Sequence, residues 1–101
     1  MNTANLQLEG LLMAVAALNR LLVSRGVVTS EEVDIALHRA EAGLGMEDRL
    51  DALSPANRDA IAFPVRVLRL ANQSRAADPM PDFADLARRV GETKQSYNDQ
   101  L

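Results

Sequence analysis

The sequence predicts an all-α protein, a small helical bundle of four to five helices built on an N-terminal antiparallel helical hairpin. Apolar residues recur every three or four positions from Leu8 to Leu22, and a second run with this spacing follows residue 29. Hydrophobic residues make up 48% of the chain and aromatic residues only 3%. The core must therefore be built from aliphatic side chains, and the abundant leucine and alanine favour helices.

The hairpin is predicted from capping residues on both sides of a short link. Gly26 can adopt the left-handed conformation that ends a helix, and Arg25 places a positive charge near the negative end of the helix dipole. Thr29 and Glu32 have the spacing of a capping box, in which each side chain accepts a hydrogen bond from the other residue's amide. We expect the first helix to end at Gly26 and the second to begin after Thr29.

The middle of the chain predicts a further helix that contains a proline. Ser54 followed by Pro55 is a good start signal, and an apolar rhythm continues from there. Pro64 removes an amide inside this pattern, so we expect a break or kink near Phe63. The stretch Phe63–Leu70 also fits an extended strand in part, but no second run of strand character is present to pair with it. Residues 46–53 are expected to form one or two helical turns.

The C-terminal part predicts one more helix, with Asp82 as its cap. Asp85 and Arg89 are spaced to form an ion pair on it, and Gly91 is the expected stop. We expect a single helical domain over residues 1–91 and a polar, frayed tail over 92–101.

Composition narrows the class of protein. The chain has no cysteine, which excludes disulfides and thiol chemistry. Its longest unbroken apolar run, Leu11–Leu18, is far shorter than the roughly 20 residues that a bilayer span needs, so we expect no membrane segment. We also expect no signal peptide, because no basic cluster precedes the apolar run. Cytoplasm is the expected location.

The charges are unevenly distributed, although the net charge is only −3. Residues 29–54 are strongly acidic and residues 55–76 are basic, which suggests that the two segments pack side by side and neutralise each other. The alternative is a free patch for an anion or an acidic partner. Its members would be Arg58, Arg66 and Arg69.

The residues of this sequence give little support for catalysis or for nucleic-acid binding. The second helix opens with acids, which would repel a DNA backbone, so we expect no nucleic-acid partner. His38 is the single histidine, and the row Glu31, Asp34, His38 and Glu41 would need matching ligands from another helix to hold a metal. We expect no enzyme activity, no cofactor and no metal.

Residues 21–37, LLVSRGVVTSEEVDIAL, resemble a hairpin near the N-termini of nitrile hydratase alpha subunits and of some secretion and pilus-assembly ATPases. The cysteine cluster of the former and the phosphate loop of the latter are missing here. The resemblance therefore implies a recurrent packing module, and no activity or binding residue follows from it.

Two functional hypotheses follow. The first is a small helical interaction protein that forms a homodimer, or binds an unidentified protein, through its first helix. The heptad-like residues that would form this interface are Leu8, Leu11, Val15, Leu18 and Leu22. The second is a ligand- or metal-binding helical bundle that acts as an accessory subunit of an enzyme.

Overall fold

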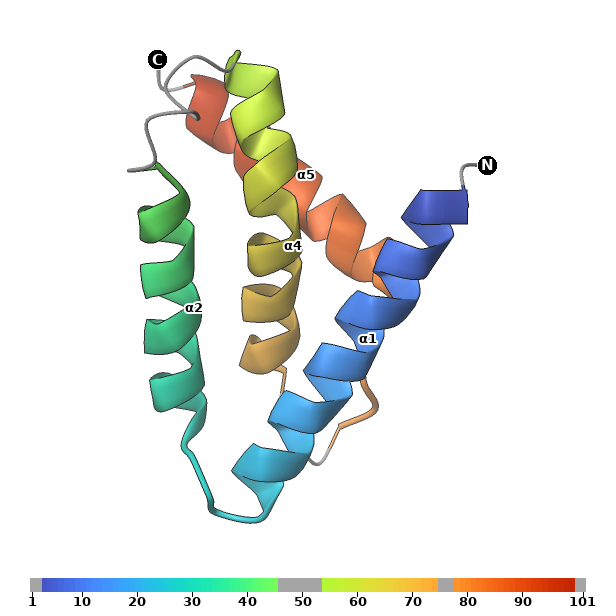
Figure 1. Ribbon diagram of the computed structural model, residues 1–101, viewed down its shortest axis with the longest axis vertical. Coiled ribbons are helices and arrows are strands. Elements are labelled where there is room, and N and C mark those ends of the chain that lie inside the picture. Colours follow the sequence, from blue (N-terminus) through green and yellow to red (C-terminus); the bar gives the residue numbers. More distant parts are fainter. Residues whose placement is uncertain (1–2, 46–53, 75–77, 100–101) are drawn as a thin grey trace.

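The computed structural model describes residues 3–45, 54–74 and 78–99, and four helices make up nearly all of them (Figure 1). They are α1 (Thr3–Ser24), α2 (Ser30–Gly45), α4 (Pro55–Gln73) and α5 (Phe83–Asp99). These parts of the chain contain no strand. The all-α prediction is confirmed, while the turns expected over 46–53 fall outside the described residues.

The link between α1 and α2 has the predicted capping geometry. Gly26 has a φ of +73°, and the amides of Gly26 and Val27 donate to the carbonyls of Val23 and Leu22, which is the Schellman arrangement. The Thr29 amide donates to the Glu32 carboxylate at 2.8 Å, and the Glu32 amide donates to the Thr29 hydroxyl at 3.0 Å. Local hydrogen bonds therefore end α1 and begin α2 as the sequence indicated.

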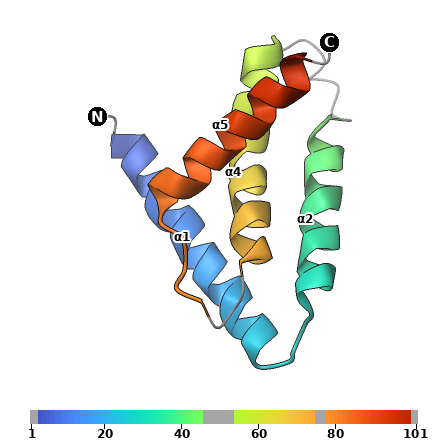
Figure 2. The same cartoon turned by 180° about the vertical axis from the view of Figure 1, so that it is seen from behind.

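Helix α4 is the centre of the fold, because α1, α2 and α5 all pack against it. In Figure 1 α1 and α2 diverge from their shared turn, with α4 between them. Figure 2 shows the molecule from behind, where α5 crosses in front of α4. The N-terminal pair is thus joined by the expected turn, but both helices have α4 as their main partner.

Helix α4 continues through Pro64, so the chain does not break near Phe63 and the strand alternative is wrong, while the kink expected there stays a prediction. The Ser54 hydroxyl accepts a hydrogen bond from the Asn57 amide at 3.2 Å, with Pro55 at the first helical position. Proline removes one helical hydrogen bond. Packing compensates for this loss, because three small apolar residues of the same helix are buried. They are Ala62, Val67 and Ala71.

Helix α5 begins at the predicted cap but ends later than expected. The Asp82 carboxylate accepts from the Asp85 amide at 2.8 Å, and Asp85 pairs with Arg89 at 2.9 Å. Hydrogen bonds to Asp85 and then to Glu92 raise the pKa of Arg88 above its ordinary value. Gly91 does not stop the helix, which runs to Asp99 and includes most of the expected tail.

The buried core lies where α1, α4 and α5 meet. Its fully buried members are aliphatic: Leu12, Ala16, Val67, Ala71, Leu86 and Val90. Phe63 and Phe83 extend this core with an edge-to-face contact, their ring centres 6.2 Å apart. None of the α2 side chains whose burial is described is fully buried. Helix α2 is therefore attached to the side of the core.

Candidate interaction surface

Three of the five residues predicted for an interface on the first helix remain open to solvent in a single copy. Leu11 is 61% exposed, Leu18 60% and Leu22 41%. Leu8 instead packs against the core, and Val15 is half-buried. Leu11, Leu18 and Leu22 therefore do not fill the intramolecular core.

The tertiary structure explains which leucines of α1 stay exposed to solvent. The core takes Leu12 and Ala16, each 4% exposed, as the main contacts of α1. A helix turns by about 100° per residue, so Leu11 points well away from the direction of Leu12. Turning Leu12 towards α4 and α5 therefore turns Leu11 and Leu18 towards solvent.

We call the exposed side of α1 its outer face. It includes Leu6 and Leu21, 49% and 50% exposed, which the sequence prediction did not place in the interface. The exposed residues that form it are Leu6, Gln7, Gly10, Leu11, Ala14, Ala17, Leu18, Leu21 and Leu22. The two charged residues of α1, Glu9 and Arg20, are half-buried, so the outer face carries no charge.

Helix α1 is also long and apolar enough to cross a bilayer, judged by length and composition alone. Only 11% of its most apolar stretch is buried in the described structure. One such helix is weak evidence for a membrane segment, because mostly buried core helices and N-terminal signal sequences pass the same test of length and composition.

The acidic α2 and the basic part of α4 neutralise each other, as the charge distribution indicated. Arg66 contacts Glu41 at 3.2 Å and Asp59 at 3.3 Å. Arg69 contacts Asp34 at 3.1 Å and Glu41 at 3.5 Å. Both guanidinium groups therefore already have carboxylate partners.

The third arginine of the predicted anion patch, Arg58, lies on the exposed first turns of α4. Arg58 and Arg66 are eight residues apart on this helix. The patch therefore stays a prediction, and carboxylates engage at least Arg66 and Arg69 within it.

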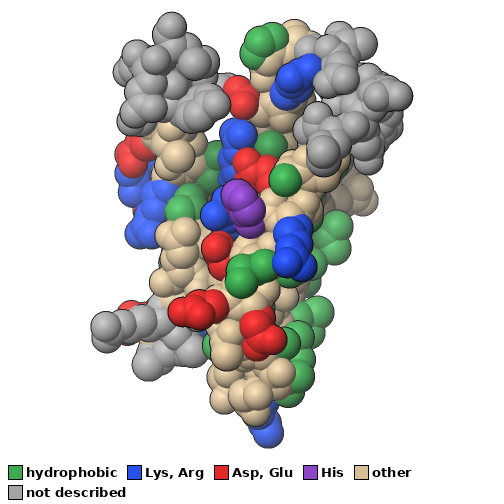
Figure 3. Space-filling model, turned by 90° about the vertical axis from the view of Figure 1, so that its left-hand side faces the viewer, with side chains coloured by type: hydrophobic (Ala, Val, Ile, Leu, Met, Phe, Trp, Pro, Cys, Tyr) green, Lys and Arg blue, Asp and Glu red, His purple; other side chains and the backbone are tan. Residues whose placement is uncertain are grey.

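His38 is exposed on α2, and Figure 3 shows it among acidic and basic side chains on this side of the molecule. Asp34, which lies four residues before His38 on this helix, pairs with Arg69. Across residues 3–45, 54–74 and 78–99, no three side chains from His, Cys, Asp and Glu come together closely enough to hold a metal ion.

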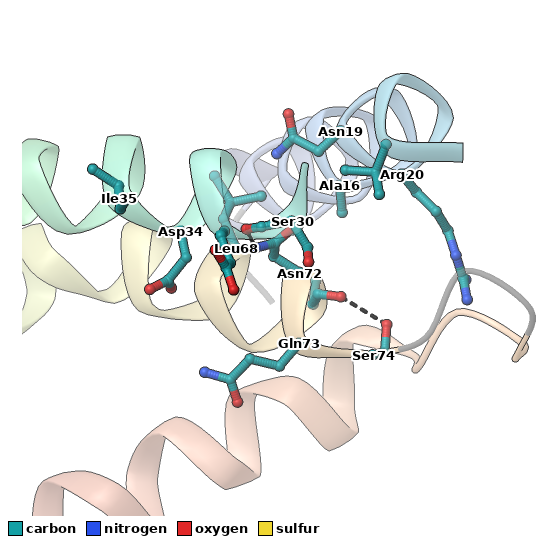
Figure 4. Close-up of a pocket in the computed structure, with 13 residues that line it drawn as sticks. Ala16, Asn19, Arg20, Ser30, Asp34, Ile35, Leu68, Asn72, Gln73 and Ser74 are labelled. Atoms are coloured by element: carbon teal, nitrogen blue, oxygen red, sulfur yellow. Dashed lines mark hydrogen bonds between the residues drawn. The ribbon is translucent and has the colours of Figure 1, made fainter. Parts of the chain in front are cut away.

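A hollow of about 480 Å³ lies between the diverging helices α1 and α2, with α4 along its floor. Ala16, Leu68 and Ala71 line it together with polar residues from all three helices. In Figure 4 the side chains of Arg20 and Gln73 point in different directions and do not converge on one point. Arg20 donates to the carbonyl of Asp78. The hollow is a gap between splayed helices with mixed walls.

No protein-family model matches the chain, and neither a curated protein nor a solved structure is similar enough to match it. The geometry of the outer face and of the hollow therefore has to support any function by itself.

Proposed function

We propose that this chain is a small helical interaction protein that self-associates through the outer face of α1. One observation carries the proposal: five leucines of a single helix are 41–61% exposed on a face without charge. They are Leu6, Leu11, Leu18, Leu21 and Leu22. Isolated exposed leucines need no explanation, whereas a continuous apolar patch on a helix is typical of an interface.

The openness of the fold supports a partner. The accessible surface is 7158 Å² for a chain of 11.0 kDa. A compact monomer of this mass is expected to expose roughly 5,600 Å². The radius of gyration is 14.3 Å, against about 12.7 Å expected for a compact domain of this length. A single copy therefore leaves more surface in water than a protein of its size usually does.

The area of the patch sets the expected strength of association. From their exposed fractions, the five leucines leave on the order of 450 Å² open, which is typical of the largest patch on a monomer. Pairing two copies would cover at most about 900 Å² from leucines, and the neighbouring alanines bring this upper value towards the ~1,200 Å² of a small specific interface. We therefore expect a weak dimer, with a dissociation constant in the micromolar range.

Sedimentation equilibrium from one to one hundred micromolar tests the proposal. The wild type is expected to shift from monomer to dimer, and Leu18→Glu is expected to stay monomeric because it places a charge in the patch. Ile35→Glu is the matched control, since Ile35 is a similarly exposed apolar residue on α2 (51%) and its replacement should leave the dimer intact.

Two results would contradict this function. A wild type that stays monomeric at one hundred micromolar would exclude self-association, and a Leu18→Glu dimer of unchanged strength would place it elsewhere. Flotation with phosphatidylcholine vesicles gives a further check, because a monomer that floats with vesicles would assign the apolar face to a membrane instead.

The alternative function is a ligand-binding bundle that serves as an accessory subunit, with the hollow between α1, α2 and α4 as its site. The volume of about 480 Å³ supports it, since small-molecule sites occupy about 300–1,000 Å³. A thermal-shift screen with divalent metals and small anions tests this reading. A ligand present at 100 times its dissociation constant should stabilise the fold by about 2.7 kcal/mol.

A further inference from the structure

The exposed residues of α1 form a straight seam with heptad spacing. Starting from Gln7, every position reached by alternate steps of four and three residues is exposed, as far as the turn that follows the helix. These seam residues are Gln7, Leu11, Ala14, Leu18, Leu21 and Arg25, all exposed in one copy. Alternation by four and three keeps one stripe of side chains facing a second helix over several turns. The seam is therefore suited to a partner that is itself a helix.

The two ends of the seam are polar in different ways. Gln7 is neutral at the N-terminal end, and Arg25 is a cation at the C-terminal end. Two copies paired in parallel would place Arg25 directly opposite Arg25 of the second copy, and two neighbouring positive charges repel each other. An antiparallel pair places each Arg25 opposite Gln7 of the second copy. In the antiparallel pair the positive N-terminal end of each helix dipole also lies beside the negative C-terminal end of the other, which is weakly favourable.

The sizes of the apolar residues favour the same orientation. In a parallel pair each residue lies opposite the same residue of the second copy. The two small Ala14 side chains would then face each other between layers of two large leucines. In an antiparallel pair Leu18 lies opposite Ala14 of the second copy, and Leu11 lies opposite Leu21. The leucines are then spread more evenly along the seam, which permits dense packing without a void at the centre.

Small residues beside the seam permit close approach. Gly10 and Ala17 are exposed on one flank of it, and a Cβ added at Gly10 would meet nothing within 4 Å. The fold of a single copy therefore does not require a glycine at this position. A glycine in mid-helix costs roughly 0.5–1 kcal/mol relative to alanine.

We propose that a second copy of this chain docks on the seam in antiparallel orientation, with Ala14 opposite Leu18 at the centre and Gln7 opposite Arg25 at the ends. This rests on the proposed self-association and adds the direction and register of the two helices. The two-fold axis crosses α1 near its middle, so both copies use the same surface.

Cysteine cross-linking tests the orientation, because the natural chain has no cysteine. In the antiparallel pair, the cysteine of Ala17→Cys lies beside the same cysteine of the second copy, displaced by about 3 Å along the helix axis. The two cysteines of a Gln7→Cys pair lie roughly 27 Å apart. A parallel pair reverses this pattern, since Gln7 then meets its own copy across the seam. A mixture of Gln7→Cys with Arg25→Cys adds a second positive test.

With a short bismaleimide, Ala17→Cys is expected to form covalent dimers and Gln7→Cys alone is not. The mixture of Gln7→Cys and Arg25→Cys is expected to form the mixed dimer. Efficient cross-linking of Gln7→Cys to itself would overturn the antiparallel orientation. The absence of all three covalent products in samples that sediment as dimers would also overturn the antiparallel orientation. This second result would not contradict self-association. Samples that sediment as monomers would instead refute the proposed function.

Discussion

The neighbouring residues Leu11 and Leu12 offer a sharp test of how α1 is oriented. They are the same residue type in the same helix, yet Leu11 is 61% exposed and Leu12 is 4% exposed. Replacing either with alanine removes the same atoms and changes helix propensity by the same amount. The difference between the two variants therefore reports burial alone.

The structure sets the expected magnitudes. Leu12 belongs to the buried cluster with Val67 and Leu86, so Leu12→Ala should lower the free energy of unfolding by about 2–5 kcal/mol. Leu11 keeps about two fifths of its surface covered within one copy. Since burying a whole leucine is worth about 1.5–3 kcal/mol, Leu11→Ala should cost about 1 kcal/mol or less in the monomer.

Urea unfolding at two protein concentrations separates the two effects. At submicromolar protein the monomer is measured, and Leu12→Ala alone should be strongly destabilised. At one hundred micromolar the dimer adds stability that depends on concentration, and Leu11→Ala should lose part of this gain. If Leu11→Ala were as damaging as Leu12→Ala in dilute solution, α1 would be rotated differently from the orientation described above.

Two further predictions concern the link after α1 and the charges between α2 and α4. Gly26→Ala should destabilise the fold by about 1–2 kcal/mol in urea unfolding, because φ at Gly26 is +73° and a Cβ is strained there; an unchanged midpoint would mean that the turn relaxes at no cost. A double-mutant cycle of Asp34→Asn and Arg69→Gln should give a coupling below about 1 kcal/mol that shrinks in 1 M salt, since both side chains are partly exposed. A larger coupling that salt does not change would show that this pair is far better shielded from water.

Helix starts could be predicted from the sequence because their determinants are local. The capping residues Thr29, Ser54 and Asp82 all form the expected hydrogen bonds with amides three residues ahead. Interruptions inside helices were predicted poorly. Pro64 and Gly91 both lie within continuous helices, because packing and helical neighbours outweigh a local preference of a few kcal/mol at most.

The candidate interface was predicted in part. The leucines of α1 fit more than one helical stripe with three- and four-residue spacing, and the sequence does not say which stripe faces inward. The predicted stripe contained Leu8 and Val15, which turn towards the protein, and omitted Leu21, which is 50% exposed. No signal within α1 could distinguish these stripes, because both sides of the helix are apolar.

The sequence by itself determined an all-helical protein, the turn between α1 and α2 and the attraction between an acidic and a basic segment. These follow from hydrogen bonds between near neighbours and from composition. Only the tertiary structure decided that α4 is the central helix and that Leu12 and Ala16 are the main buried contacts of α1. The physical reason is that the rotation of an apolar helix depends on the neighbours available to cover it. Once α4 and α5 cover one side of α1, its remaining leucines face outward as the proposed interface.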